Sequence, residues 1–147
     1  MAFQEYFVKK GMLENRVYEG VDLLLSELTR RGKCLVLATS KPEPFAVKIL
    51  EHFRLREYFS YVCGAETDEK TRMKKEDVIR YALEKSGFSP EDCVMVGDRK
   101  YDILGAKCFG MATVGVLYGY GSAEELKEAG ADVLCRDLLE LKEVLFS

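Results

Sequence analysis

Residues 93–102 read CVMVGDRKYD, and this stretch decides the class of fold. Its first four residues are uniformly apolar, which is typical of a parallel strand buried on both faces. Gly97 and Asp98 end the strand, and a helix is expected from about Asp102 to Phe109, where Gly110 stops it. A short buried strand that leads directly into a helix predicts one unit of an alternating α/β fold.

The same alternation extends in both directions along the chain. Short apolar runs predict further strands at residues 34–38, 60–63, 111–116 and 133–135. Helical spacing predicts helices between them, marked by Val21, Leu24, Leu25 and Leu28; by Phe45, Ile49 and Phe53; by Val78, Ile79, Ala82 and Leu83; and by Leu138, Leu141 and Leu145. Ser122 and Glu125 form a capping-box pattern that opens one more short helix, ended by Gly130. These elements predict a mainly parallel sheet with helices on both faces.

The composition excludes several classes of function. The 147 residues carry a net charge of -3, and Lys and Arg are scattered, so nucleic-acid or anionic-membrane binding has no support. Five cysteines without a C-x-x-C pair, and a single His52, argue for buried reduced thiols rather than zinc or disulfides. Neither a signal peptide nor a run of roughly 18 apolar residues is present, so a cytoplasmic location is expected.

Polar residues follow the predicted strands where active sites of α/β sheets gather. Thr39 and Ser40 follow one strand, Asp98 follows another, and Asp102 opens the next helix. A hydroxyl and free backbone N–H groups suit phosphate oxygens, and two carboxylates four residues apart suit Mg²⁺. Lys75, at the start of a helix, adds a compact positive charge. The set predicts a joint phosphate and Mg²⁺ site.

Each residue also has an ordinary structural interpretation. Thr39 and Ser40 could cap the following helix, Asp102 could interact favourably with a helix dipole, and Lys75 could be a solvated surface lysine. Asp98 is harder to explain in this way, because a carboxylate directly after a buried strand needs a partner. The joint occurrence of all of them favours the functional interpretation.

These motifs together resemble the haloacid dehalogenase superfamily. Residues 37–42 (LATSKP) are similar to its second motif, Lys75 to its third-motif lysine, and residues 96–102 to its fourth motif, G-D-x-x-x-D. Residues 115–122 (GVLYGYGS) are typical of the phosphoglycolate phosphatase-like and bacterial 5′-nucleotidase-like branch. The resemblance runs from about Val17 onward and implies a three-layer Rossmann-like core.

The resemblance also implies roles. Thr39 would bond the transferring phosphoryl group with help from the Ser40 backbone N–H, and Lys75 would neutralise negative charge. Asp98 would bind Mg²⁺ directly, and Asp102 would bind it through water or orient Lys75. Arg99 could bind the phosphate of a small phosphate-ester substrate or point to solvent, and Tyr118 and Tyr120 could touch substrate or pack their turn.

One departure stands out against the family pattern. The family begins with a mid-sheet strand ending in D-x-D, whose first aspartate attacks phosphorus, and this sequence has no D-x-D. Residues 3–14 resemble instead the last cap helix and the return to the core. The implied division is a cap remnant and linker at residues 1–16 and an incomplete core at residues 17–147.

The departure has two expected consequences. Strands 34–38 and 93–96 would pair directly, pair with another chain, or leave open edges that promote self-association. A chain without its nucleophile would also be inactive by itself.

Two other hypotheses stay open at the level of sequence. One is a non-catalytic phosphate-binding or interaction protein derived from a phosphatase of this superfamily. The other is a receiver domain of two-component signalling, which needs an acidic pair after its first strand and an aspartate after its third. The residues at the strand ends, Thr39, Gly64, Asp98 and Val116, argue against a receiver domain.

Overall fold

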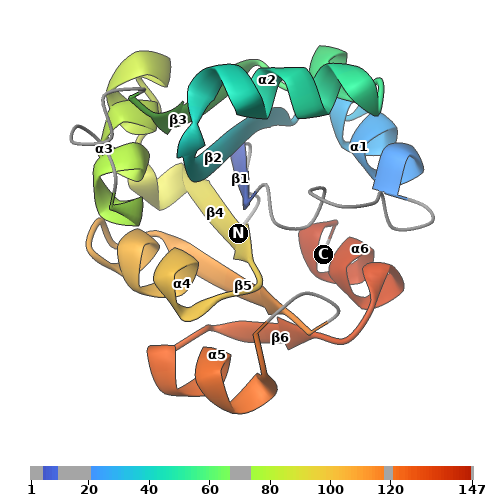
Figure 1. Cartoon of the computed structure of the whole chain (residues 1–147). Coiled ribbons are helices and arrows are strands. Elements are labelled where there is room, and N and C mark those ends of the chain that lie inside the picture. The colour runs from blue at the N-terminus through green and yellow to red at the C-terminus, as the bar shows by residue number, and fades with distance from the viewer. Residues whose placement is uncertain (1–4, 10–20, 67–73, 118–120, 147) are drawn as a thin grey trace.

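The computed structural model describes residues 5–9, 21–66, 74–117 and 121–146. Within them, six strands form one parallel sheet in the order β3-β2-β1-β4-β5-β6 (Figure 1). The strands are β1 (Glu5–Lys9), β2 (Cys34–Pro42), β3 (Tyr61–Ala65), β4 (Cys93–Gly97), β5 (Ala112–Val116) and β6 (Val133–Cys135). The predicted α/β class with a parallel sheet is therefore confirmed.

Helices connect the strands and cover both faces of the sheet. They are α1 (Val21–Arg30), α2 (Glu43–His52), α3 (Lys75–Ser86), α4 (Lys100–Lys107), α5 (Ala123–Ala129) and α6 (Leu138–Leu145). Two short 3-10 helices, η2 (Arg56–Tyr58) and η3 (Pro90–Asp92), precede β3 and β4. No helix among these described segments is long and apolar enough to cross a bilayer.

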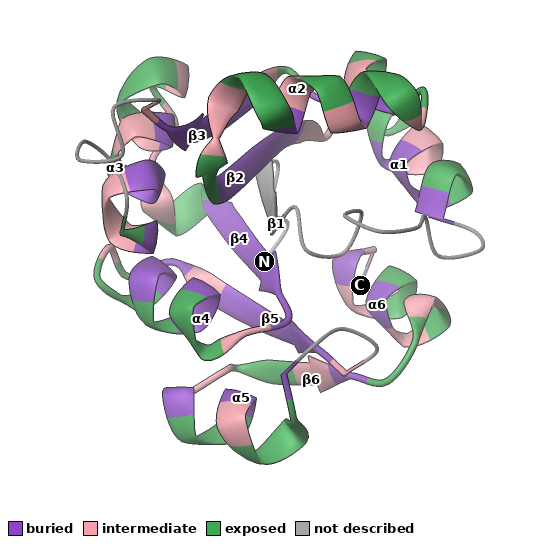
Figure 2. Ribbon diagram, viewed as in Figure 1, coloured by how far each residue is buried: buried purple, intermediate pink, exposed green. Residues whose placement is uncertain are grey.

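The strands bury alternate side chains in two different cores. Leu35, Leu37, Val94 and Val96 face one core, to which α1, α2 and α6 contribute their apolar side chains. Val36, Ala38 and Met95 face the other core, which is closed by α3 and α4. Because both faces are covered, β4 and residues 34–38 of β2 read as continuous apolar runs, while each helix keeps an exposed outer side (Figure 2).

Strand β1 corrects the expectation for the start of the chain. The helix expected in residues 3–14 is wrong over Glu5–Lys9, which is a strand lying between β2 and β4. Tyr6 is in register with Leu35 on one side and with Val94 on the other. The two strands that were expected to pair directly, to pair with another chain or to leave open edges are thus joined through β1. The open edges of the sheet are those of β3 and β6.

Strand β2 continues past the predicted end at residue 38. Its pairing with β3 shifts register between Ala38 and Pro42, so the polar residues lie in an irregular extension of the strand. Helix α2 begins after Pro42 and has no side-chain cap. The capping interpretation of Thr39 and Ser40 is therefore wrong, which leaves their polar groups to other partners.

Candidate active site

The carboxyl ends of β2 and β4 lie on the same edge of the sheet, because all strands are parallel. Thr39, near the end of β2, is 3% exposed, and Asp98, directly after β4, is 0% exposed. A fully buried carboxylate requires compensation by hydrogen bonds or positive charge. The neighbourhood of Asp98 is therefore polar by necessity.

Lys75 links two separate parts of this edge. It is the first residue of α3, and its side chain is buried rather than solvated. Its Nζ donates to the Ala38 carbonyl at 2.5 Å and lies 3.0 Å from Asp102 Oδ1. The lysine thus connects the residue before Thr39 with the first turn of α4, and the interpretation of Lys75 as a surface residue is wrong.

Asp102 is held on both of its carboxylate oxygens. Oδ1 pairs with Lys75, and Oδ2 accepts the backbone N–H of Arg99 at 3.1 Å. A Cβ atom at Gly97 would lie 2.6 Å from Oδ2, so only glycine leaves room for this side chain. Of the two roles implied for Asp102, orienting Lys75 fits this geometry better than binding a cation.

Thr39 and Ser40 differ in exposure. The Thr39 hydroxyl accepts the backbone N–H of Lys41 at 3.2 Å, which fixes the side chain of this buried residue against the irregular part of β2. The Ser40 side chain is exposed. Only its backbone N–H was expected to act, and an exposed side chain is compatible with that role.

Arg99 has a protein partner that the sequence did not indicate. Its Nε donates to Glu125 Oε2 at 3.0 Å, and its guanidinium carbon lies 5.3 Å from the centre of the Tyr101 ring. The hydrogen bond with Glu125 raises the pKa of Arg99. The side chain is 34% exposed and directed to α5.

Glu125 is the residue that sequence reasoning missed. The Ser122 hydroxyl caps α5 as predicted, accepting the Glu125 N–H at 3.0 Å. The Glu125 carboxylate, however, reaches Arg99 and the backbone N–H of Lys100, the latter at 2.8 Å. The Lys100 N–H and then the Arg99 guanidinium lower the pKa of Glu125. No local signal reveals a bond to residues so far back in the chain.

A family model described as haloacid dehalogenase-like hydrolase matches residues 2–116. The chain belongs to the haloacid dehalogenase-like hydrolase family. A 5′-nucleotidase from Pseudomonas aeruginosa is 43% identical over 99% of this chain and 65% of its own length. A phosphoglycolate phosphatase from Vibrio cholerae is 36% identical over 97% of this chain and 63% of its own length. The tyrosine-protein kinase PtkA from Mycobacterium tuberculosis is 37% identical over 99% of this chain and 50% of its own length.

Solved structures agree with this family. A predicted phosphatase from Clostridium acetobutylicum has a TM-score of 0.87 and 47% identity, covering 93% of this chain and 63% of that one. This haloacid dehalogenase-like chain thus spans less than two thirds of the length of the curated relatives named above. The family assignment confirms the resemblance drawn from the motifs, and it leaves no support for a receiver domain.

The carboxylates can be tested against a magnesium site. Mg²⁺ is commonly held by one or two carboxylates together with water and substrate phosphate. Asp98 satisfies the first requirement, whereas Asp102 is already engaged by Lys75 and Arg99. No group of three or more His, Cys, Asp and Glu side chains gathers in the described part of the chain. The described residues therefore fit a site in which Asp98 is a direct protein ligand and phosphate and water supply the rest.

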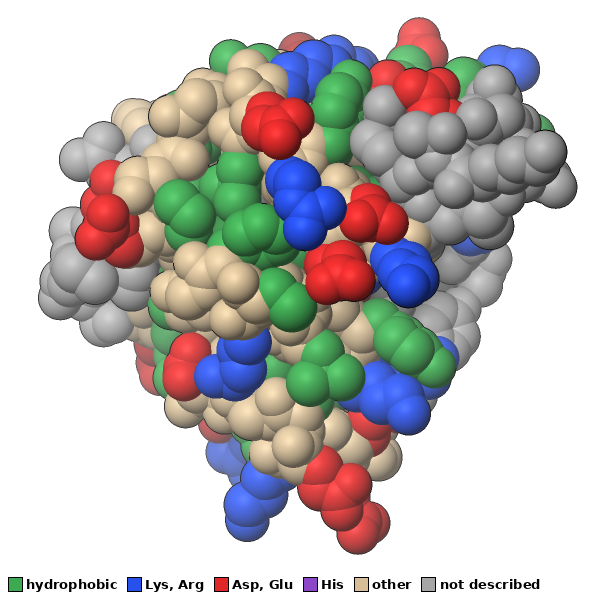
Figure 3. Space-filling model, turned by 90° about the vertical axis from the view of Figure 1, so that its left-hand side faces the viewer, with side chains coloured by type: hydrophobic (Ala, Val, Ile, Leu, Met, Phe, Trp, Pro, Cys, Tyr) green, Lys and Arg blue, Asp and Glu red, His purple; other side chains and the backbone are tan. Residues whose placement is uncertain are grey.

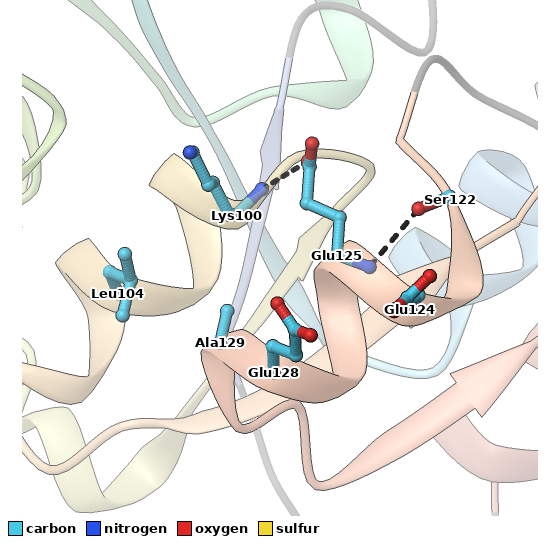
Figure 4. A pocket seen from close by; sticks show the side chains of 7 residues that line it. All are labelled: Lys100, Leu104, Ser122, Glu124, Glu125, Glu128 and Ala129. Carbon is cyan, nitrogen blue, oxygen red and sulfur yellow. Dashed lines mark hydrogen bonds between the residues drawn. The ribbon is translucent and has the colours of Figure 1, made fainter.

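A shallow pocket of about 430 Å³ lies between α4 and α5 (Figure 4). It is lined by Lys100, Leu104, Ser122, Glu124, Glu125, Glu128 and Ala129. Thr39, Lys75, Asp98 and Asp102 do not line it, so it is separate from the strand-end groups. Tyr118 and Tyr120, which were considered as substrate contacts, lie outside the described residues.

The side of the molecule that Figure 3 presents carries interspersed charges. Lys and Arg side chains alternate there with Asp and Glu side chains, and no continuous basic area is visible. This face gives no electrostatic support to binding of a polyanion.

Proposed function

We propose that this chain is the core of a magnesium-dependent phosphomonoester hydrolase that acts on a small phosphate ester. The observation that carries the proposal is the buried Lys75, whose Nζ contacts both the Ala38 carbonyl beside Thr39 and the Asp102 carboxylate. A buried ammonium group next to Thr39 is suited to neutralise the charge that spreads over a phosphoryl group during transfer.

The residues would divide the work as follows. The Thr39 hydroxyl accepts one hydrogen bond and still carries a hydrogen that it can donate to a phosphate oxygen. The Ser40 N–H would give a second donor, and Asp102 would keep Lys75 directed at the site. Asp98 would hold Mg²⁺, which when bound supplies Lewis-acid charge at the phosphoryl oxygens.

The attacking carboxylate is the missing component. No D-x-D occurs in the sequence, and β1, which lies in the middle of the sheet, contains no aspartate. We propose that the nucleophile belongs to a segment outside this sequence, that residues 1–16 derive from the cap and its linker, and that the 147 residues alone do not hydrolyse phosphate esters.

The names of the relatives guide the choice of substrate. They include a 5′-nucleotidase and a phosphoglycolate phosphatase. A nucleoside 5′-monophosphate or phosphoglycolate is therefore the proposed substrate class, with action in the cytoplasm and without a nucleic-acid or membrane partner.

The decisive experiment compares two proteins. One is the 147-residue chain, and the other is the same chain preceded by the segment that its gene encodes upstream of Met1. Both are assayed with an aryl phosphate, a nucleoside 5′-monophosphate and phosphoglycolate as substrates. We expect Mg²⁺-dependent phosphate release only from the longer protein, with loss of at least about 100-fold in Asp98→Asn. Asp77→Asn is the matched control, because Asp77 pairs with Arg80 on the exposed side of α3. Equal activity of Asp98→Asn and the parent would contradict the proposal.

The absence of D-x-D favours one second candidate, a non-catalytic phosphate-binding or interaction protein. It predicts that both proteins bind inorganic phosphate in calorimetric titrations, that Lys75→Met abolishes the binding, and that neither hydrolyses any ester. Phosphate release by the longer protein would eliminate this candidate.

A further inference from the structure

Two consecutive residues, Arg99 in the β4–α4 loop and Lys100 at the start of α4, are hydrogen-bonded to a single carboxylate of α5. Glu125 Oε2 accepts the Arg99 Nε–H at 3.0 Å and the Lys100 backbone N–H at 2.8 Å. The bond to Lys100 is visible in Figure 4, where the Glu125 side chain points away from its own helix toward the start of α4. The loop is therefore held at its backbone as well as by a side chain.

Gly121, which precedes α5, lies close to the backbone of Asp98 itself. Gly121, just before α5, lies so close to the Asp98 carbonyl oxygen that a Cβ atom at this position would overlap it, and that Cβ would lie 2.9 Å from Glu125 Oε2. Asp102 holds the other side of the loop through the Arg99 N–H. Contacts from α4 and from the start of the α5 region therefore hold the backbone of Asp98 and Arg99 on two sides.

We infer that Glu125 is a positioning residue that sets the direction of the Asp98 carboxylate. Asp98 lies between β4 and α4, so the orientation of its carboxylate depends on the backbone conformation of Arg99 and Lys100. A ligand carboxylate must be held within roughly 0.5 Å of its productive position, which requires support from surrounding groups. This inference rests on the proposed function, in which Asp98 binds Mg²⁺.

A purely stabilising role accounts less well for the contacts. The Arg99–Glu125 pair is partly exposed, with side-chain exposures of 34% and 24%, and such pairs add little to stability. The bond to the Lys100 N–H is different, because it fixes the first helical residue of α4 from another helix. Through this hydrogen bond, α5 fixes the position of the backbone that follows Asp98.

The test measures Mg²⁺ binding by the 147-residue chain in the presence of inorganic phosphate, which the proposed site needs to complete the coordination of the ion. Binding is followed through the Mg²⁺-dependent rise in melting temperature and the amide chemical shifts of the β4–α4 loop. We expect Glu125→Ala to weaken the apparent Mg²⁺ affinity about tenfold or more, as loss of supporting partners does at metal sites. Glu125→Gln, which keeps one acceptor oxygen, is expected to fall between parent and Glu125→Ala. Glu124→Gln is the matched control, since Glu124 is an exposed neighbour on the same helix turn.

The outcomes separate the inference from the proposed function. If the parent responds to Mg²⁺, Asp98→Asn does not, and Glu125→Ala binds Mg²⁺ like the parent, the inference is overturned while the proposed function stands. If parent and Asp98→Asn are equally insensitive to Mg²⁺, the metal site of the proposed function fails and the inference fails with it. A uniform loss of melting temperature in Glu125→Ala without a change in Mg²⁺ affinity would mark Glu125 as structural only.

Discussion

Lys75 and Asp102 form an ion pair with 3.0 Å between Nζ and Oδ1, and both side chains are almost completely buried. The two residues come from the first turns of different helices, α3 and α4. Burying two charges is costly unless they remain paired and hydrogen-bonded. The pair therefore ties the placement of α3 to that of the β4–α4 loop.

Removing the cation should leave a buried carboxylate without its charge partner. Lys75→Met is expected to lower the free energy of unfolding by about 3–5 kcal/mol, measured by urea denaturation. Lys74→Met, which changes the exposed residue next to it, should lie within about 0.5 kcal/mol of the parent.

The double variant Lys75→Met/Asp102→Asn provides the internal check on this prediction. Because it removes the charge that Lys75→Met leaves behind, it should be more stable than Lys75→Met alone. A double variant that loses the sum of both single effects would mean that the two side chains do not depend on each other.

Gly97→Ala should disturb the Lys75–Asp102 ion pair through a steric clash with Asp102. The new methyl group would press against the Asp102 side chain, and such overpacking typically costs about 1–3 kcal/mol. Gly87→Ala is the control, because Gly87 adopts φ 76° at the end of α3 with no atom within 4 Å of the added methyl group, so its cost of about 1 kcal/mol is one of backbone strain. Mg²⁺ titrations monitored by melting temperature should show a weaker response in Gly97→Ala alone. Similar responses in both variants would argue against a link between Gly97 and the site.

The bonds at Glu125 predict a pH dependence of stability. Lys100 N–H and Arg99 hold the folded-state pKa of Glu125 below its ordinary value of 4.5. The carboxylate thus stabilises the fold above pH 4.5, and this contribution is lost as the pH falls through the lower folded-state pKa. Glu125→Gln should lose less unfolding free energy than the parent as the pH is lowered through and below 4.5 in urea denaturation series. Identical slopes for Glu125→Gln and the parent, with Glu124→Gln as reference, would contradict this.

Strand β1 predicts a change in association state. Val8 is paired with Leu37 on one side and Val96 on the other, so a proline there removes a backbone donor inside the sheet. Val8→Pro should expose the facing edges of β2 and β4 and shift the protein toward oligomers or aggregates in size-exclusion chromatography with light scattering. A monomeric Val8→Pro variant with the parent's melting temperature would show that β1 is not needed to join the sheet.

Most of the architecture was predictable because buried parallel strands have a simple sequence pattern. The runs at residues 93–96 and 133–135 agree with β4 and β6 to within one residue, and Gly130 ends its helix as expected. The start of the chain was not predictable in this way. The five-residue segment Glu5–Lys9 is too short to show a helical or a strand periodicity. Its conformation is set by the space between β2 and β4 in which it lies.

The site was predictable in its residue types and less so in its connections. The approach of Lys75 to Asp102 follows from their motifs, but its bond to the Ala38 carbonyl depends on the fold. The backbone N–H of Glu125 is capped by Ser122 as the capping-box pattern predicts. Its carboxylate instead accepts a hydrogen bond from the start of α4. Side chains that join distant segments are invisible to local patterns, since their partners exist only after the sheet has formed.

The central place of β1 also bears on how the chain folds. Strand β1 pairs with β2 and with β4, and β4 (Cys93–Gly97) follows β1 (Glu5–Lys9) at a long distance along the chain. During synthesis, Glu5–Lys9 is made well before Cys93–Gly97, so its second ladder can close only after the later strand has been made. Closing so large a loop is a slow step, so completion of the β1–β4 ladder would be a late event of folding.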